Sequence, residues 1–253
     1  MKSILLIGIG SGHPEQITVQ AIKALNRASV FFLLDKGEAK DELVRLRKEI
    51  CQRYIEQPGY RLVQVSDPLR EDNEVTYQAG VERWHAQRAE LFARLIDKEL
   101  AENECGAFLV WGEPGLYDST LRILDRVVAL GGPAFEVEVI PGISSVQALA
   151  ARHRIPLNRI GEPIRITTGR RLEAADLDNV VVMLDAHCAF GQFADQELEI
   201  YWGAYLGTED ELLVSGKLHE VQGRIRELRE AARLSKGWIM DTYLLRRPLN
   251  PDQ

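Results

Sequence analysis

Short apolar runs alternate with longer amphipathic segments along most of the chain. The apolar runs that predict strands in the first part are 3–9, 30–34, 60–65, 105–110 and 135–140. The segments that predict helices, with apolar side chains every three or four positions, are 15–28, 41–54, 78–104 and 119–130. The polar, acidic segment 66–76 is expected as a loop. Strands that alternate with helices in this way are typical of a parallel α/β sheet.

The alternation continues after residue 140. Strands are expected at 164–167, 179–184, 200–206 and 238–244, and helices at 144–152 and 217–234. The arginines of the last helix predict a solvated face; they are Arg224, Arg226, Arg229 and Arg233. We therefore expect an α/β protein of two lobes with mostly parallel sheets, divided into 1–140 and 141–253, with a ligand cleft between the lobes.

The composition of the chain argues against several classes of protein function. Apolar residues make up 45% of the chain and charged residues 27%, which is typical of a globular protein, and no apolar run is long enough for a transmembrane helix. The net charge of −7 argues against general nucleic-acid binding. Cys51, Cys105 and Cys188 lack metal-ligand spacing. We therefore expect reduced thiols, a cytoplasmic location and no metal.

Three glycine-containing loops each stand between a predicted strand and a predicted helix. The first runs from Gly8 to Pro14 and carries Gly10 and Gly12; the second runs from Gly112 to Gly115, and the third from Pro141 to Ser145. Loops at the carboxyl ends of strands in open α/β sheets expose backbone polar groups and bind ligands there. The three loops together predict one composite site.

A dinucleotide-binding interpretation is open for the first loop. Its glycines suit close approach of a phosphate at a helix N-terminus, and Asp35 follows the second strand, where a ribose-binding acid is expected. Against this, the third glycine comes one position early, and His13-Pro14 occupies the place needed for close helix–strand packing. A NAD(P)-dependent oxidoreductase is therefore the main alternative of a different class.

The order of the loops resembles that of the tetrapyrrole (corrin and porphyrin) methyltransferases, which use S-adenosylmethionine. Their first loop is usually Gly-x-Gly-x-Gly-Asp-Pro followed by Leu-Thr, and here it is followed by Ile17-Thr18. Their second is Gly-Asp-Pro and their third Pro-Gly-x-Ser/Thr-Ser, which match the two later loops. Three further segments resemble one enzyme of this family in particular: 146–155, 166–171 and 237–243. That enzyme acts in cobalamin synthesis and couples methylation to loss of an acetyl group.

The resemblance implies a set of residues that contact the cofactor, S-adenosylmethionine. They are Trp111, Gly112, Glu113, Leu116, Ser144, Ser145, Met183 and Ala204. Glu113 stands where the family usually has Asp. Methyl transfer from a sulfonium to carbon needs in-line approach in a dry site and no metal. The resemblance also implies that the first loop borders the substrate, with Ser11, and with Asp35 and Lys36 unless these two form a plain surface turn.

The implied substrate is precorrin-5, which would be methylated at carbon 1 and would lose its acetyl group as acetate. Its carboxylates suit guanidinium groups, for which Arg170 and Arg171 are the first choice, although surface charge is equally compatible. The second choice is Arg152, Arg154 and Arg159. Loss of the acetyl group needs a residue that activates water or stabilises an oxyanion. Glu113 and Tyr117 are the expected catalytic residues, with Asp118 and Asp185 as further candidates.

Two wider expectations complete the sequence analysis. Members of the resembled family are typically homodimers, and Trp84 and Phe92 on the long predicted helix suit either an interface or the core of the first lobe. The second alternative function is another methyltransferase of the same class, acting on a protein side chain or on a nucleic acid. The low basicity of the chain argues against it.

Overall fold

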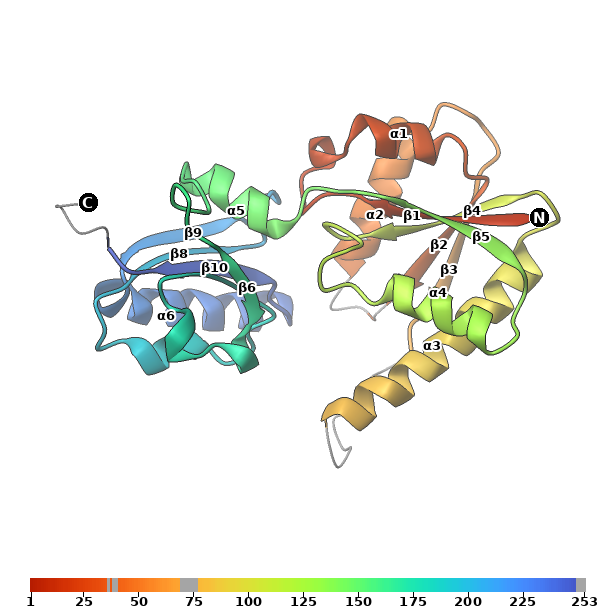
Figure 1. The fold of residues 1–253 in the computed structure, drawn as a ribbon. Helices are drawn as coiled ribbons and strands as arrows, with labels where there is room; N and C mark the ends of the chain where they lie inside the picture. The colour runs from red at the N-terminus through yellow and green to blue at the C-terminus, as the bar shows by residue number, and fades with distance from the viewer. Residues whose placement is uncertain (36, 38–40, 69–76, 249–253) are drawn as a thin grey trace. The chain divides into compact units, whose positions relative to one another are not determined.

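The chain folds into two compact units, Met1–Ile143 and Ser144–Gln253, each with its own sheet (Figure 1). The structure, a computed structural model, describes all residues except 36, 38–40, 69–76 and 249–253. Lys36 and most of the loop expected at 66–76 therefore lie outside the described residues. The prediction of two α/β lobes is confirmed.

The first unit contains a five-stranded parallel sheet. Its strands are β1 (Lys2–Gly8), β2 (Val30–Asp35), β3 (Arg61–Ser66), β4 (Cys105–Val110) and β5 (Phe135–Ile140). They lie in the order β3-β2-β4-β1-β5, and every neighbouring pair is parallel. Residues 4–8 of the interior strand β1 are all buried, because helices cover both faces of the sheet.

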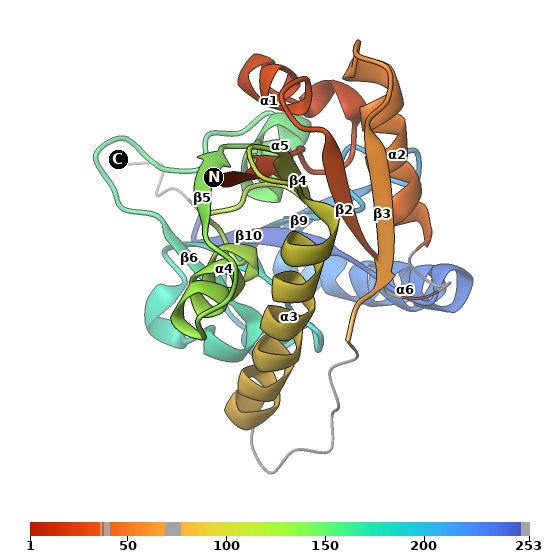
Figure 2. The ribbon, with the colours of Figure 1, turned by 90° about the vertical axis from the view of Figure 1, so that its right-hand side faces the viewer.

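Two helices cover each face of this sheet. Figure 2 shows α1 (Val19–Leu25) and α2 (Asp41–Tyr54) on one side, and α3 (Tyr77–Glu99) and α4 (Thr120–Ala129) on the other. Phe92 of α3 is fully buried and stacks on Phe108 of β4, with ring centroids 4.4 Å apart. It therefore belongs to the core. Trp84 is partly buried and donates from its ring nitrogen to the carbonyl of Pro68 at 2.8 Å.

Two predicted helices of this unit were too long. The segment 15–28 divides into a 3-10 turn, η1 (Pro14–Gln16), and α1, because Ile17 and Thr18 are extended. The Thr18 hydroxyl caps α1 by accepting from the backbone N–H of Ala21 at 3.0 Å. The long helix ends at Glu99 rather than at residue 104, and the Glu104 carboxylate accepts from the N–H of Ala101 in the turn before β4.

The second unit contains a mixed five-stranded sheet. Its strands are β6 (Arg165–Thr168), β7 (Asn179–Met183), β8 (Glu199–Ala204), β9 (Leu212–Lys217) and β10 (Asp241–Arg246). In the order β6-β7-β10-β8-β9, only β6 and β7 are parallel. The sequence analysis did not predict β9, whose apolar run is only three residues long. The predicted strand 238–244 begins instead at Asp241.

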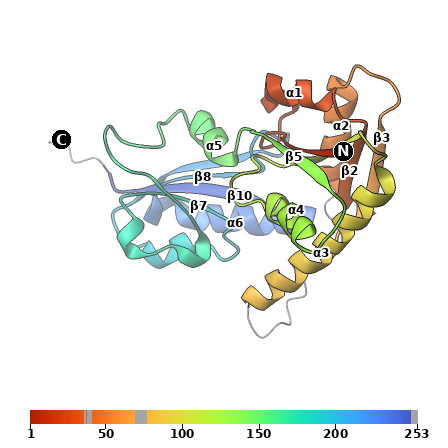
Figure 3. The same ribbon diagram turned by 45° about the vertical axis from the view of Figure 1, so that its right-hand side comes forward.

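The sheet of the second unit also lies between helices. Figure 3 shows α5 (Ser145–His153) on one side and α6 (Leu218–Lys236) on the other. The side toward α6 holds the larger core, which includes the fully buried Trp202 and Tyr243. Three 3-10 turns connect the strands: η3 (Gly169–Arg171), η4 (Ala174–Asp176) and η5 (Ala189–Phe193). None of the described helices combines the length and the apolar character that crossing a membrane requires.

The predicted solvated arginine face of α6 is wrong at one position. Arg224, Arg226 and Arg233 are exposed, but Arg229 is only 3% exposed. Arg229 lies one helical turn after the buried Ile225 and therefore faces the sheet, where it pairs with Asp241.

Candidate functional site

The first two glycine loops begin at a topological switch point of the first sheet. β1 and β4 are neighbours, yet the chain leaves β1 through α1 toward β2, and leaves β4 through α4 toward β5, on the other side of β1. The two connections therefore leave adjacent strand ends toward opposite faces of the sheet, with α1 on one face and α4 on the other (Figure 2). In open α/β sheets, ligands bind in the crevice that such diverging loops leave at the carboxyl edge.

Backbone contacts join all three loops at this edge. Gly10 and Gly112 form an antiparallel bridge, in which the N–H of Gly112 donates to the carbonyl of Gly10 at 2.7 Å. A Cβ atom on Gly142 would overlap with the carbonyl oxygen of Gly112 and would lie 2.8 Å from the Cα of Gly8. Side chains at Gly8 and Gly142 would therefore force the loops apart.

The Glu113 carboxylate fastens the second loop to the third. One oxygen, Oε2, accepts from the backbone N–H of Gly142 at 2.9 Å, and the other, Oε1, accepts from the N–H of Gly115 at 2.5 Å. Both oxygens are thus engaged within the protein. The side chain that replaces the usual Asp is a connector between loops in this structure.

The remaining expected residues of the second loop differ in exposure. Trp111 is partly buried and packs against the core beneath α1 and α2. Leu116 is half-buried, and its backbone N–H donates to the carbonyl of Glu113 at 3.3 Å. Tyr117 is 43% exposed and has a left-handed backbone, with a φ of 52°. Tyr117 is therefore the most exposed of these three residues.

The two substrate residues expected in the first unit are held by the fold itself. Ser11 is buried, and its N–H and hydroxyl both donate to Oε1 of Gln16, at 3.1 and 2.8 Å. Asp35 ends β2, and its carboxylate accepts from the N–H of Gly37 at 2.8 Å and from Gln64 at 3.0 Å. The hydrogen bond from Gly37 lowers the pKa of the Asp35 carboxyl, which favours the ionised form.

One edge of the second sheet collects the remaining expected cofactor residues. Ser144 is buried and caps α5, its hydroxyl accepting from the N–H of Val146 at 3.2 Å. The hydroxyl of Ser145 lies 3.0 Å from that of Thr242, the second residue of β10. Thr242 pairs in register with Met183, and the preceding residue of β10 pairs with Ala204. The structure thus brings Ser145, Met183 and Ala204 together around Thr242.

Thr242 was not identified from the sequence. Its segment, 237–243, contributed only to the resemblance, and no local pattern distinguishes one threonine in a strand. Its position at the site depends on β10 entering the sheet antiparallel to β7 and β8.

The basic pair lies at the same edge of the second sheet. Arg170 and Arg171 are exposed in η3, directly after β6, whose last residue Thr168 pairs with Met183. The second-choice arginines are held elsewhere in the unit. Arg152 pairs with Glu211 at 2.5 Å, and Arg159 donates to the carbonyl of Arg247. Arg154 ends α5 in a left-handed conformation.

The two further carboxylate candidates are engaged locally. Asp118 accepts from the N–H of Thr120 at 2.7 Å at the start of α4. Asp185 is 5% exposed and accepts from the N–H groups of His187 and Ala189 and from the hydroxyl of Tyr243. Asp185 therefore has a structural role in the turn after β7.

A buried guanidinium of α2 lies next to the second loop and was also missed. Arg47 donates from Nε to the carbonyl of Leu109 in β4 at 2.9 Å, and from Nη1 to the carbonyl of Leu43 at 2.8 Å. Burial lowers its pKa to about 10, although the Asp118 carboxylate opposes this shift. In the sequence, Arg47 is only one of several charged residues of an amphipathic helix. Within the described ranges, no three His, Cys, Asp or Glu side chains converge as metal ligands.

The glycine contacts generate a stability prediction for Gly142→Ala. The added Cβ would meet the backbone of Gly112 and Gly8, which cannot rotate away, so we expect a loss of about 1–3 kcal/mol in the free energy of unfolding. Urea denaturation measures this loss. Hydrogen exchange should also be faster at Gly112, whose N–H donates within the loop contact.

The matched control is Gly223→Ala in α6, where an added Cβ meets no atom within 4 Å. We expect this change to be neutral or slightly stabilising, because Ala favours the helix. Equal stability of Gly142→Ala and wild type would contradict the close approach of the loops.

Comparison with known proteins agrees with the loop motifs. The family model of the Tetrapyrrole (Corrin/Porphyrin) Methylases matches residues 3–222. The chain is 54% identical over 256 residues to "Precorrin-6A synthase [deacetylating]" of Sinorhizobium sp, covering 100% of this chain and 98% of that protein.

Solved structures agree in fold. A putative cobalamin synthesis related protein from Corynebacterium diphtheriae is 44% identical, with a TM-score of 0.84 over 98% of this chain and 99% of that chain. A uroporphyrin-III C-methyl transferase from Thermus thermophilus, in complex with S-adenosyl homocysteine, is 19% identical, with a TM-score of 0.56 over 96% and 92% of the two chains. The chain belongs to the tetrapyrrole (corrin/porphyrin) methylase family.

Proposed function

We propose that this chain transfers a methyl group from S-adenosylmethionine to carbon 1 of precorrin-5 and releases the acetyl group as acetate, giving precorrin-6A. The observation that carries the proposal is the 54% identity, over the full length of this chain, to a deacetylating precorrin-6A synthase. The chain is accordingly an S-adenosylmethionine-dependent methyltransferase of cobalamin synthesis.

The residues of the two edges fit a cofactor that carries an adenosyl and a methionyl group. Gly8 and Gly142 let the three loops of the first edge pack backbone against backbone, which fixes the position of the second loop. When bound, the cofactor supplies an electrophilic methyl group on a sulfonium. We assign its binding to the group named from the resemblance: Trp111, Gly112, Glu113, Leu116, Ser144, Ser145, Met183 and Ala204.

The third loop supports this assignment because Gly142 lies at the edge of the first sheet and Ser145 at the edge of the second. The N–H of Gly142 is hydrogen-bonded to Glu113, and the hydroxyl of Ser145 is hydrogen-bonded to that of Thr242. Three peptide units separate Gly142 from Ser145, so their Cα atoms lie within about 11 Å of each other.

For the substrate, we assign carboxylate recognition to Arg170 and Arg171, with Asp35 and the backbone of Ser11 bordering the macrocycle. Both arginines are exposed and follow a strand end at the edge that carries Met183. Guanidinium groups recognise carboxylates through paired hydrogen bonds, which suits a macrocycle with several acetate and propionate groups.

For loss of the acetyl group, we assign Tyr117 and Glu113 different tasks. The Tyr117 phenol is exposed in the second loop and can donate a hydrogen bond to a developing oxyanion. The Glu113 oxygens already accept two backbone N–H groups. Its contribution is to hold the second and third loops in place while both ligands are bound.

The oxidoreductase alternative is weakened by the contacts of the first loop. A dinucleotide phosphate would need the backbone N–H groups of the glycine loop. Here the N–H of Gly10 donates to Gly112 at 3.3 Å, and that of Ser11 donates to Gln16 at 3.1 Å. These donors are satisfied within the protein.

The proposal includes a cytoplasmic reaction and no metal, in keeping with three free cysteines. It also includes a homodimer, for which Phe92 is unsuited because it is fully buried. Val137 and Val139 on the edge strand β5 are 38% and 39% exposed and are better placed for contact with a second copy. Sedimentation equilibrium at micromolar concentration should give a mass near twice 28.6 kDa. A monomer would contradict the dimer.

The cofactor assignment is tested by ligand-dependent thermal stability. S-adenosylhomocysteine at about 100 times its Kd should add about 2.7 kcal/mol to the free energy of unfolding. For a chain of this size, that is a rise of roughly 5–10 °C in Tm. NAD and NADP at the same concentration should leave Tm unchanged. Stabilisation by NAD or NADP alone would favour the oxidoreductase instead.

The substrate assignment is tested by changing Arg170 and Arg171 to Ala together. We expect the KM for precorrin-5 to rise by at least about tenfold, since each charge-assisted hydrogen bond contributes roughly 1.5–3 kcal/mol. The Kd of S-adenosylhomocysteine should stay within about twofold of wild type, because neither arginine is among the proposed cofactor contacts. Loss of a single contact of 1.4 kcal/mol would already change the Kd about tenfold.

The control is Arg224→Ala, at an exposed position of α6. An equal loss of affinity for cofactor and substrate in the double variant would mean that the pair supports the fold or the cofactor site.

A further inference from the structure

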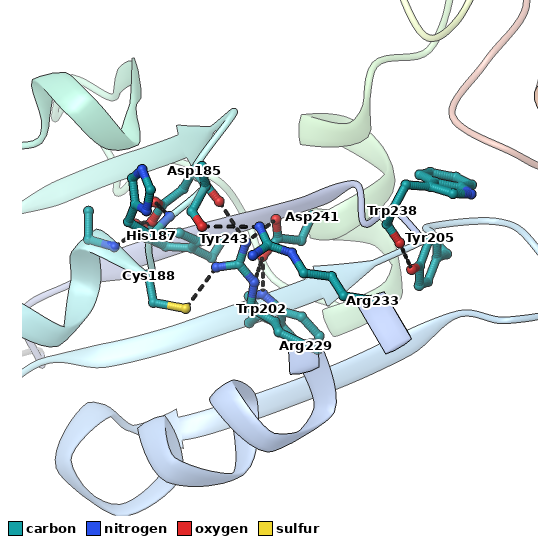
Figure 4. Close-up of polar contacts among 12 residues, drawn as sticks. Asp185, His187, Cys188, Trp202, Tyr205, Arg229, Arg233, Trp238, Asp241 and Tyr243 are labelled. Atoms are coloured by element: carbon teal, nitrogen blue, oxygen red, sulfur yellow. Dashed lines mark hydrogen bonds and ion pairs between the residues drawn. The ribbon is translucent and has the colours of Figure 1, made fainter. Parts of the chain in front are cut away.

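A buried arginine of α6 makes polar contacts with residues that follow β7 and with the first residue of β10 (Figure 4). Arg229 donates from Nη2 to the backbone carbonyl of Asp185 at 2.6 Å and from Nη1 to the sulfur of Cys188 at 2.7 Å. Its Nε lies 3.2 Å from the Asp241 carboxylate, and both side chains are 4% exposed. One guanidinium thus contacts the turn after β7 and the first residue of β10.

The Asp185 carboxylate shapes the turn that Arg229 contacts. Its Oδ1 accepts from the N–H of His187 at 2.9 Å, and its Oδ2 accepts from the N–H of Ala189 at 2.6 Å. The Tyr243 hydroxyl donates to the same Oδ2 at 2.7 Å, which connects the turn to β10. Figure 4 shows Asp185 and Asp241 on either side of the Arg229 guanidinium.

Asp241 connects this group of residues to β8. Its carboxylate accepts from the ring N–H of Trp202 in β8 at 2.7 Å. In the sheet register, Asp241 lies opposite Ala204, and the next residue, Thr242, lies opposite Met183. The contacts of Arg229 therefore reach the backbone positions that carry Met183 and Ala204.

The backbone is strained just beyond those two residues. Leu184, directly after β7, has a φ of 52°, and Tyr205, directly after β8, has a φ of 49°. Left-handed conformations are unfavourable for non-glycine residues and persist where surrounding contacts hold them. Asp185 follows Leu184, and Tyr205 donates from its N–H to the carbonyl of Met240, beside Asp241, at 3.0 Å.

Electrostatics argues that these contacts exist for positioning rather than for stability. Burial opposes the charged form of Arg229, but Asp241, Cys188 and Asp185 together outweigh burial, so the pKa of the guanidinium lies above its usual value. Burial raises the pKa of the Asp241 carboxyl despite that partner. Buried ion pairs contribute little net stability compared with apolar packing of the same volume. The Arg229–Asp241 pair instead maintains the geometry of the two strained turns.

We propose that Arg229 is a positioning residue for cofactor binding, which holds the turns after β7 and β8 so that Met183 and Ala204 are presented to S-adenosylmethionine. Asp185 and Asp241 transmit its effect, one through the turn after β7 and the other through β10. The inference rests on the proposed function, because it takes the edge around Thr242 as part of the cofactor site.

The experiment measures S-adenosylhomocysteine binding by calorimetry in Arg229→Met, Arg229→Lys and Asp241→Asn. Methionine fills the same space without the contacts to Asp185 and Asp241, so we expect the Kd to rise at least about tenfold. Lysine keeps the charge without the forked geometry and should restore only part of the affinity. Asp241→Asn keeps the shape and an acceptor for Trp202 but removes the ion pair, and it should also weaken binding.

Steady-state kinetics distinguishes positioning from a general structural role. Loss of cofactor positioning in the bound ground state should raise the KM for S-adenosylmethionine, with kcat at saturation within about twofold of wild type. A merely structural role would lower Tm and leave the Kd of the folded protein unchanged. The matched control is Arg224→Met, an exposed arginine of the same helix, for which Kd and Tm should stay at the wild-type values.

Each result decides the inference. If Arg229→Met fails to fold, Arg229→Lys and Asp241→Asn carry the test, and wild-type affinity in every folded variant overturns the proposed role of Arg229. Failure of the wild-type protein to bind S-adenosylhomocysteine would instead overturn the proposed function, which keeps the two failures distinct.

Discussion

Close approach of three backbones at the carboxyl edge of the first sheet is the constraint on which the site depends. β4, β1 and β5 are neighbours, and Ile7 of β1 pairs with Leu109 on one side and Ile140 on the other. Their loops therefore emerge at the same level and must pass one another without side chains. Glycine at 8 and 142 permits this, and Gly112 takes a φ of 71°. Glu113 then fixes the arrangement by accepting from the third loop.

The second unit meets a similar requirement by different means. Because β10 runs antiparallel to β7 and β8, its first residues arrive where those two strands end. The turns that follow the two strands are left-handed at the non-glycine residues Leu184 and Tyr205. Side-chain contacts hold this edge: the Ser145–Thr242 hydroxyl pair and the ion pair of Arg229 with Asp241. Backbone fit dominates one edge and buried charge the other.

The elements and loops that were predicted correctly are those encoded by short stretches of sequence. The bounds of α2, β4 and β5 agree with those predicted, since their periodicity is strong and breaking residues follow both strands. The three loops were found for the same reason, as short motifs between strand and helix. β9 was missed because three apolar residues make a weak signal. Arg229 was misplaced because its spacing along α6 matches that of exposed arginines, and its partners lie far away in the sequence.

The two ends of the third loop are each anchored within their own unit. The boundary between them falls between Ile143 and Ser144, inside the loop. On one side, the N–H of Gly142 is bonded to Glu113; on the other, Ser144 caps α5 and Ser145 is bonded to Thr242. The first unit fixes its end of the loop through the close approach of Gly8 and Gly142 and through the Glu113 carboxylate. The second unit fixes its end through Thr242, which follows Asp241, the ion-pair partner of Arg229. A backbone contact and a buried charge thus act on the loop from the two units to which its ends belong.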